Sequence, residues 1–458
     1  MKRMRKDLPI EYMRSEKSLM FPRFFSSLRK HIDAKCSEKG VSANILFQKA
    51  FPKSPKAETV SSAFFRMKTA AVAAVAAAAF AVAAQALAQV SVSVPRINLP
   101  EDERPRADAP FERWQFSGHL QDDEGRRYGL TASFFIVRFD GLPDARFMYY
   151  CLSEKDEGRF HSGSLVEKSA AATMKSAVAA LPGDVRFALS PDISDESEIE
   201  KNHRFMKEEP TVMGEALGLR FDGNYFVNEK SPGRDWEDWR YGARLTDGAF
   251  EAELEMKPER GPMFAGGDGV VGLEHGGDLF LYSFPRMAAK GRLRIGGETR
   301  RARGVLWYDH KYGALGDAAN PAGWDWFRVQ LEDGTDMSLL IFRRPDTGER
   351  FHRLATVKWG DGRVSVVRDI VVEPLNTWTS PDTGVVYPLD WAVAIPSLRA
   401  HLTIRQDMPY QETRVFGPLR AVWAGSGRAE AVIDGERQAG TVFTELAGYR
   451  AEPEGALP

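Results

Sequence analysis

The chain has 458 residues, which corresponds to about three domains of ordinary size or two larger β domains. Hydrophobic residues make up 43% of it and aromatic residues 11%, which is enough for a sizeable core and excludes a wholly disordered chain. Residues 1–66 hold 15 of the 62 Lys and Arg but only 6 of the 64 Asp and Glu, so the remaining chain is acidic, with 47 against 58, which argues against a nucleic-acid partner.

A secretory signal peptide is predicted over residues 67–88. Lys68 supplies a basic head, an Ala/Val run follows from Ala70 to Ala84, and an Ala-x-Ala cleavage site ends at Ala88. The apolar run is shorter than the roughly 20 residues that span a bilayer. We therefore expect a periplasmic or secreted protein with no integral membrane segment in the mature chain. An Ala-rich buried helix is the alternative.

Residues 1–66 precede this signal peptide, whereas a signal peptide normally stands first. They are interpreted as an over-extended reading frame or a disordered basic leader. Either way Cys36 is lost and the mature protein keeps only Cys151. We therefore expect no disulfide framework and no cysteine zinc site.

The body of the chain is predicted to be all-β with minor helix. Trp114–Leu120 and Gly129–Arg138 flank a Gly-containing turn and predict a hairpin. Apolar residues alternate with glutamates over Ala249–Met256, which is typical of a strand with one buried and one solvent-exposed face. Helical composition is confined to Ser169–Leu181, with a short helix or loop at Ser194–Lys207. Further strands are expected at Leu279–Phe284, Gly304–Tyr308, Val364–Val372, Ala400–Ile404 and Thr441–Leu446.

The first hairpin has a counterpart later in the chain. Phe116-x-x-x-Leu120-x-Asp122 matches Phe327-x-x-x-Leu331-x-Asp333, and the return strand from Ser133 matches the one from Ser338. A repeat near 200 residues is too long for a solenoid or a propeller blade. It favours two successive antiparallel barrels or sandwiches, with chance similarity of two amphipathic hairpins as the alternative.

Several catalytic motifs are excluded. The Gly267-x-Gly269-x-x-Gly272 pattern lacks the strand before it and the helix after it that a dinucleotide fingerprint requires. No nucleophile elbow and no His-Glu-x-x-His occurs. The histidines show no metal-ligand spacing, so neither a metal nor a cofactor is predicted.

The densest chemical cluster is the run Trp307–Tyr312. On a strand, Tyr308 and His310 share one face while Trp307 and Asp309 share the other. A His and a Tyr that face one cavity could transfer a proton. Asp309, on the opposite side of the strand, could orient a neighbouring group or supply a negative charge to it. The alternative is a structural histidine inside a domain interface.

A second cluster follows after the loop Gly313–Gly323. Trp324, Asp325 and Trp326 provide an apolar ligand wall with one acid. The alternative is a Trp-rich corner that packs against the other domain. Lesser candidates are Glu112–Trp114, Glu274–His275, Tyr282 with Arg286, and Glu445 with Tyr449, where Arg286 or Arg113 could instead be a buried partner of a carboxylate.

In this order, these segments resemble the AttH/CrtC family over about residues 105–452. The resemblance is carried by Glu112–Leu120, Gly129–Arg138, Tyr282-Ser-x-x-Arg286, Trp307–His310, Gly323–Phe327, Asp333-Gly334 and Glu445–Tyr449. The family includes carotenoid 1,2-hydratase, also called hydroxyneurosporene synthase, and exported relatives labelled predicted secreted hydrolases.

The resemblance implies two tandem lipocalin-like antiparallel β-barrel domains, at residues 99–300 and 301–458. Such barrels hold a lipophilic ligand in the interior or at the domain junction. In the hydratases an acid protonates an isoprenoid double bond and water adds to it. His310 matches the family's Asp-His motif, and Tyr312 stands where many members carry Trp. The family's Tyr-x-Asp acid is missing from Met337–Arg343.

We therefore expect an exported protein that binds a lipophilic, isoprenoid- or carotenoid-like small molecule. As a hydratase-type lyase it would use Asp309 or Asp325 as acid and His310 as base. As an alternative it is a non-catalytic periplasmic carrier, and as a second alternative a secreted hydrolase. The expected ligand-binding residues are Tyr308, Tyr312, Trp324, Trp326, Trp114, Tyr282 and Arg286.

Overall fold

A computed structural model describes residues 96–179, 196–228, 235–272, 278–314, 323–344 and 347–450. All of them belong to one compact unit, Ala83–Pro458. The predicted leader at 1–66, the predicted signal peptide at 67–88, and Glu274 with His275 lie outside the described residues. None of the described helices has the length and hydrophobicity needed to cross a membrane.

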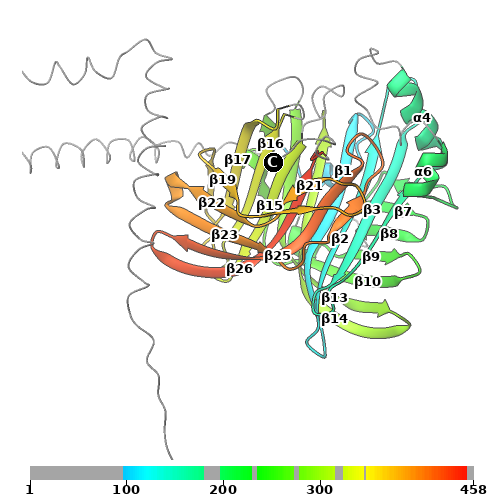
Figure 1. Ribbon diagram of the computed structural model, residues 1–458. Helices are drawn as coiled ribbons and strands as arrows, with labels where there is room; N and C mark the ends of the chain where they lie inside the picture. The colour runs from blue at the N-terminus through cyan, green and yellow to red at the C-terminus, as the bar shows by residue number, and fades with distance from the viewer. Residues whose placement is uncertain are drawn as a thin grey trace, which may run out of the picture. The chain divides into compact units, whose positions relative to one another are not determined.

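The first of two large sheets contains fourteen of the described strands (Figure 1). Its hydrogen-bonded order is β5-β4-β3-β2-β1-β14-β13-β10-β9-β8-β7-β6, with β11 and β12 paired to β13. The strands are β1 Phe111–Asp122, β2 Arg127–Val137, β3 Ala145–Glu154, β4 Arg159–Val166, β5 Arg204–Phe205, β6 Thr211–Met213, β7 Gly218–Phe221, β8 Asn224–Asn228, β9 Tyr241–Thr246, β10 Phe250–Pro258, β11 Met263–Phe264, β12 Val270–Gly272, β13 Asp278–Ile295 and β14 Glu298–Gly313.

The second sheet has the order β18-β17-β16-β15-β26-β25-β23-β22-β19, with β24 paired to β25. Its strands are β15 Gly323–Leu331, β16 Asp336–Arg343, β17 Arg350–Lys358, β18 Val364–Val367, β19 Val371–Pro374, β22 Trp391–Ile395, β23 Ala400–Gln406, β24 Glu412–Arg414, β25 Ala421–Ile433 and β26 Glu436–Ala447. A separate ribbon pairs β20 (Thr377–Thr379) with β21 (Val386–Pro388). The sheets meet where β1 contacts β26 and β2 contacts β25.

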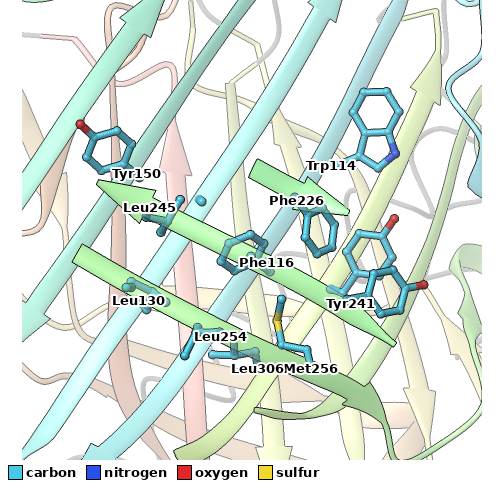
Figure 2. Close-up of a cluster of buried hydrophobic side chains, with 14 of the residues drawn as sticks. Trp114, Phe116, Leu130, Tyr150, Phe226, Tyr241, Leu245, Leu254, Met256 and Leu306 are labelled. Atoms are coloured by element: carbon cyan, nitrogen blue, oxygen red, sulfur yellow. The ribbon is translucent and has the colours of Figure 1, made fainter. Parts of the chain in front are cut away.

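Each sheet curls around its own apolar core. In the first sheet Phe134 on β2 lies edge-on to Phe221 on β7, with ring centroids 5.3 Å apart, although many strands separate them in the hydrogen-bonded order. The ring of Tyr150 on β3 likewise contacts that of Phe250 on β10, with centroids 5.9 Å apart. Figure 2 shows side chains from distant strands on one interior, among them Tyr150 on β3, Phe226 on β8 and Leu254 on β10. The all-β fold class predicted from the sequence is confirmed, and two tandem barrels are consistent with these curled sheets.

The two related hairpins are present. β1 pairs with β2 in the first sheet, and β15 pairs with β16 in the second. Phe116 and Phe327 occupy matching places, each buried in the core of its own sheet. β14 continues the first sheet to Gly313, so the expected domain boundary after residue 300 falls inside this strand.

The other predicted elements are also found. The helix expected at Ser169–Leu181 is α4, Lys168–Ala179, which buries Ala170 and Met174 one turn apart. The segment Ser194–Lys207 contains the short helix α6, Glu196–Asn202. The strand expected over Val364–Val372 is split between β18 and β19. After Gly272 the next described residues form β13, so the Gly-rich motif connects strands.

Candidate functional site

Strand β14 presents the predicted site residues on two opposite faces. Tyr308 lies in the core of the first sheet, and the His310 ring packs against Tyr282 in that same interior. Asp309 and Lys311 point the other way, toward the second sheet, where they meet Arg328 and Trp326. The alternation expected from strand geometry is therefore present, and it separates Asp309 from His310.

An additional acid, Glu103, enters the interior of the first sheet. It ends the short helix η1, Glu101–Glu103, in the segment before β1, and its side chain is fully buried. Its carboxylate accepts hydrogen bonds from the hydroxyls of three tyrosines, Tyr241, Tyr282 and Tyr308. No arginine or lysine among the described residues pairs with it.

The environment of Glu103 favours its protonated form. Burial raises its pKa above the ordinary 4.5, against the opposing effects of the charge of His310 and of the tyrosine hydrogen bonds. The hydroxyls of Tyr241, Tyr282 and Tyr308 keep their protons as well, because burial and the neighbouring Glu103 raise their pKa values. The interior therefore holds a carboxyl group suited to donate a proton.

His310 is oriented by a second glutamate. Its Nε2 lies 3.1 Å from Oε1 of Glu112, and the imidazole stacks on Trp114 with ring centroids 4.8 Å apart. The other ring nitrogen, Nδ1, is buried and has no hydrogen-bond partner among the described residues. If the proton lies on Nε2, where the Glu112 carboxylate accepts it, Nδ1 carries a lone pair that can take a proton from water.

The predicted acid Asp309 is fully engaged at the junction between the sheets. One carboxylate oxygen accepts hydrogen bonds from Ser283 and from the Trp307 indole, and the other accepts one from Arg328 at 2.6 Å. Asp309 is buried, and it serves there to join β14 to β15. Its expected role as the acid stays a prediction.

Beside Asp309, Lys311 lies among aromatic rings of both sheets. Its Nζ is 5.0 Å from the centroid of Trp324, 5.1 Å from that of Trp326, and 5.9 Å from that of Phe111. Trp324 and Trp326 therefore face this junction rather than His310. Burial, followed by the nearby charge of Arg113, lowers the pKa of Lys311 to about 7.

The remaining predicted residues lie elsewhere. Asp325 accepts hydrogen bonds from Arg343 and from Tyr449, on the side of β15 that faces the second core. Arg286 on β13 instead binds Asp336 of the second sheet. Tyr312 continues the interior face of β14, with its ring 5.1 Å from that of His310.

A cavity of about 610 Å³ opens at the edge of the first sheet, near α6. It is lined by Tyr150, Gly163, Ser164, Glu200, Lys201, Asn202, His203, Arg204, Phe205 and Asp247. None of the predicted site residues lines it. Within the described ranges, no group of three His, Cys, Asp or Glu side chains could hold a metal ion.

Glu103 is not predicted as a site residue from the sequence. It stands in the run Glu101-Asp102-Glu103, in a polar lead-in with Pro100 and Pro105, which resembles a solvated loop. No spacing or motif distinguishes the buried glutamate from its exposed neighbour Glu101. Glu112, in contrast, was among the lesser candidates.

Comparisons with known proteins agree with the fold. A model of the AttH-like family matches residues 204–449. A crystal structure assigned to AttH from Nitrosomonas europaea has a TM-score of 0.59 and 21% identity, covering 79% of this chain and 98% of that one. Kievitone hydratase from Nectria haematococca also has a TM-score of 0.59, with 15% identity, covering 79% and 95%. A comparison with curated proteins gave no significant match.

Proposed function

The chain belongs to the AttH-like family, and from that premise we propose that it is a hydratase-type lyase. In this proposal it adds water to a double bond of a lipophilic, isoprenoid-like molecule held in the interior of the first sheet. The observation that carries the proposal is the buried carboxyl of Glu103, which is held by three tyrosines and interacts electrostatically with His310, whose Nδ1 has no hydrogen-bond partner among the described residues. The hydratase among the structural neighbours supports the same reaction class.

Glu103 is the proposed proton donor. Hydration of an alkene begins when a proton adds to one carbon of the double bond, leaving a carbocation on the other. A carboxyl whose pKa is raised by burial remains protonated closer to neutral pH and can make this transfer. The tyrosine hydroxyls that hold Glu103 then stabilise the carboxylate that forms.

His310 is the proposed base for water. Its Nδ1 takes one proton of the water as the oxygen bonds to the carbocation, while Glu112 stabilises the imidazolium that results. The substrate gains one proton on one carbon and one hydroxyl group on the other, and transfer of a proton from His310 back to Glu103, through solvent, restores the enzyme for the next turnover. The rings of Trp114 and Tyr308 provide electron-rich faces toward which a carbocation is attracted.

The carrier hypothesis remains the alternative. Both acids predicted from the sequence, Asp309 and Asp325, are bound by arginines, which is what a purely architectural role would require. Export through the predicted signal peptide at 67–88 also remains part of the proposal, because a periplasmic or secreted setting suits either role.

The test uses the chain from Gln89 onward, purified from a periplasmic extract. Native mass spectrometry would identify a co-purified lipophile, which would then be incubated with wild-type protein and with the Glu103→Gln variant. A ligand that gains the mass of one water with the wild type only supports the lyase. A ligand that both proteins retain unchanged would overturn it and favour the carrier.

A further inference from the structure

A cluster of five buried charged side chains lies where β1 and β14 meet β15 and β26, and the charges within this cluster do not balance. Arg113, Lys311 and Arg328 are cationic, whereas Asp309 and Glu445 are anionic. Each carboxylate already has its own arginine, because Arg113 pairs with Glu445 at 2.6 Å and Arg328 pairs with Asp309 at 2.6 Å. When Lys311 is protonated, one positive charge is left over.

In the part of the chain that the structure describes, Lys311 is the member of this cluster without a counter-ion. It is 3% exposed, and among the described residues no carboxylate lies within 4 Å of its Nζ and no atom accepts a hydrogen bond from it. Its contacts are the rings of Phe111, Trp324 and Trp326. Aromatic rings attract an ammonium group but do not neutralise it. A buried charge normally requires a partner.

A second cationic group in the cluster is incompletely satisfied. Nη1 of Arg328 is buried and has no hydrogen-bond partner within the described ranges, while its Nε and Nη2 donate to Asp309 and Gln115. The junction therefore contains more hydrogen-bond donors than acceptors. Buried donors of this kind are usually satisfied in proteins, by protein, water or an ion.

We propose that Lys311 binds the carboxylate of a lipophilic organic anion at the junction between the sheets. The carboxylate would supply the missing charge, and the indoles would contact the apolar part of the molecule. Of the three aromatic residues around Lys311, only Trp324 is half-buried, whereas Phe111 and Trp326 are buried. The apolar part of the bound molecule can therefore extend along Trp324 toward solvent. This site lies on the opposite face of β14 from Glu103 and does not depend on the proposed lyase activity.

The protonation of Lys311 makes this binding pH-dependent. Arg113 and Arg328 disfavour its charged form, Asp309 and Glu445 favour it, and the pKa lies at about 7. Only the charged amine attracts a carboxylate. Apparent affinity should therefore fall by roughly tenfold for each pH unit above 7, because the competent fraction falls by that factor.

The experiment measures binding of decanoate by titration calorimetry at pH 6, 7, 8 and 9. Decanol tests the apolar chain without the charge, and acetate tests the head group alone. Lys311→Met removes the charge, Lys311→Arg keeps it at every pH, and Lys290→Met alters an exposed lysine that already pairs with Glu255. Thermal unfolding checks that each variant folds.

The expected result is decanoate binding at least tenfold tighter than decanol at pH 6, lost in Lys311→Met and retained in Lys290→Met. In Lys311→Arg the affinity should become nearly independent of pH. Equal binding of decanol and decanoate, or an unchanged pH profile in Lys311→Arg, would overturn the proposal. If acetate bound as strongly as decanoate, the site would be one for small anions. The proposal that its ligand is lipophilic would then be overturned.

Discussion

Arg113 of the first sheet and Glu445 of the second form a bidentate pair, with N–O distances of 2.8 and 2.6 Å, and both side chains are buried. The pair has a reciprocal partner, since Arg328 of the second sheet binds Asp309 of the first. Gln115 links the two pairs by donating to Glu445 and accepting from Arg328. Each sheet thus supplies one arginine and one carboxylate to the other.

Removing Arg113 should destabilise the protein strongly. Burial alone would raise the pKa of Glu445, but Arg113, Arg328 and Lys311 together outweigh that effect and lower the pKa. Arg113→Met therefore leaves a buried carboxylate without its main partner. We expect a loss of about 3–5 kcal/mol in the free energy of unfolding, measured by urea denaturation. The double variant with Glu445→Gln should recover part of this loss.

The matched control is Arg127→Met, because Arg127 pairs with Asp156 at the surface. Its effect should stay within about 1 kcal/mol. If Arg113→Met were no more destabilising than this control, the pair would not hold the sheets together.

Replacing Glu103 should stabilise the protein while it removes activity. Because burial raises the pKa of Glu103 above 4.5, the folded state keeps a proton that the unfolded state releases as the pH rises. Stability is therefore lost above pH 4.5, and Glu103→Gln should avoid that loss. Denaturation curves of the variant and the wild type should coincide below pH 4.5 and separate above it.

In the hydration assay Glu103→Gln should reduce the rate by about 10²–10⁴-fold. Glu101→Gln, at the exposed end of the same short helix, should change neither stability nor rate. Full activity in Glu103→Gln would contradict the proposal that Glu103 is the proton donor.

The variant His310→Gln tests whether His310 acts as a base or only as a hydrogen-bond donor to Glu112. The new amide can still donate to Glu112, but the basic nitrogen of the imidazole is gone. We expect the hydration rate to fall by about 10²–10⁴-fold while ligand is still retained in native mass spectra. His401→Gln, at an exposed position on β23, serves as the control. Loss of retention together with rate would mean that His310 is structural.

Gly304 is required where β14 pairs with β1, opposite Leu120. A Cβ placed on it would lie 1.9 Å from the carbonyl oxygen of His119, so the two strands could not keep their separation. Gly304→Ala should cost about 1–3 kcal/mol, measured by thermal or chemical unfolding. Gly214→Ala, where no atom of the described residues lies within 4 Å of the new methyl group, should be close to neutral.

Local patterns in the sequence predicted the strands well. The hairpins, the helix α4 and the separation of Tyr308 from Asp309 follow from periodicity and turn residues, which act over a few positions. The pairing of β1 with β14 and the stacking of β1 against β26 connect residues hundreds of positions apart. No local pattern specifies such contacts.

For that reason the predicted site residues did not gather in one place. His310, Trp114, Tyr282 and Tyr308 lie together in the first interior. Trp324 and Trp326 share a strand with Asp325 but face the junction, where they meet Lys311. The sequence identified chemically capable side chains, and the sheet order decided which of them meet.

The proposed proton donor Glu103 lies outside the strands of both sheets. The proposed proton donor lies on a short segment that precedes the first strand and takes no part in a sheet ladder, whereas His310 belongs to the scaffold itself. The region matched by the family model, residues 204–449, contains His310 but not Glu103. In the proposed mechanism, a change confined to that segment would therefore remove the proton donor and leave the strands of both sheets in place.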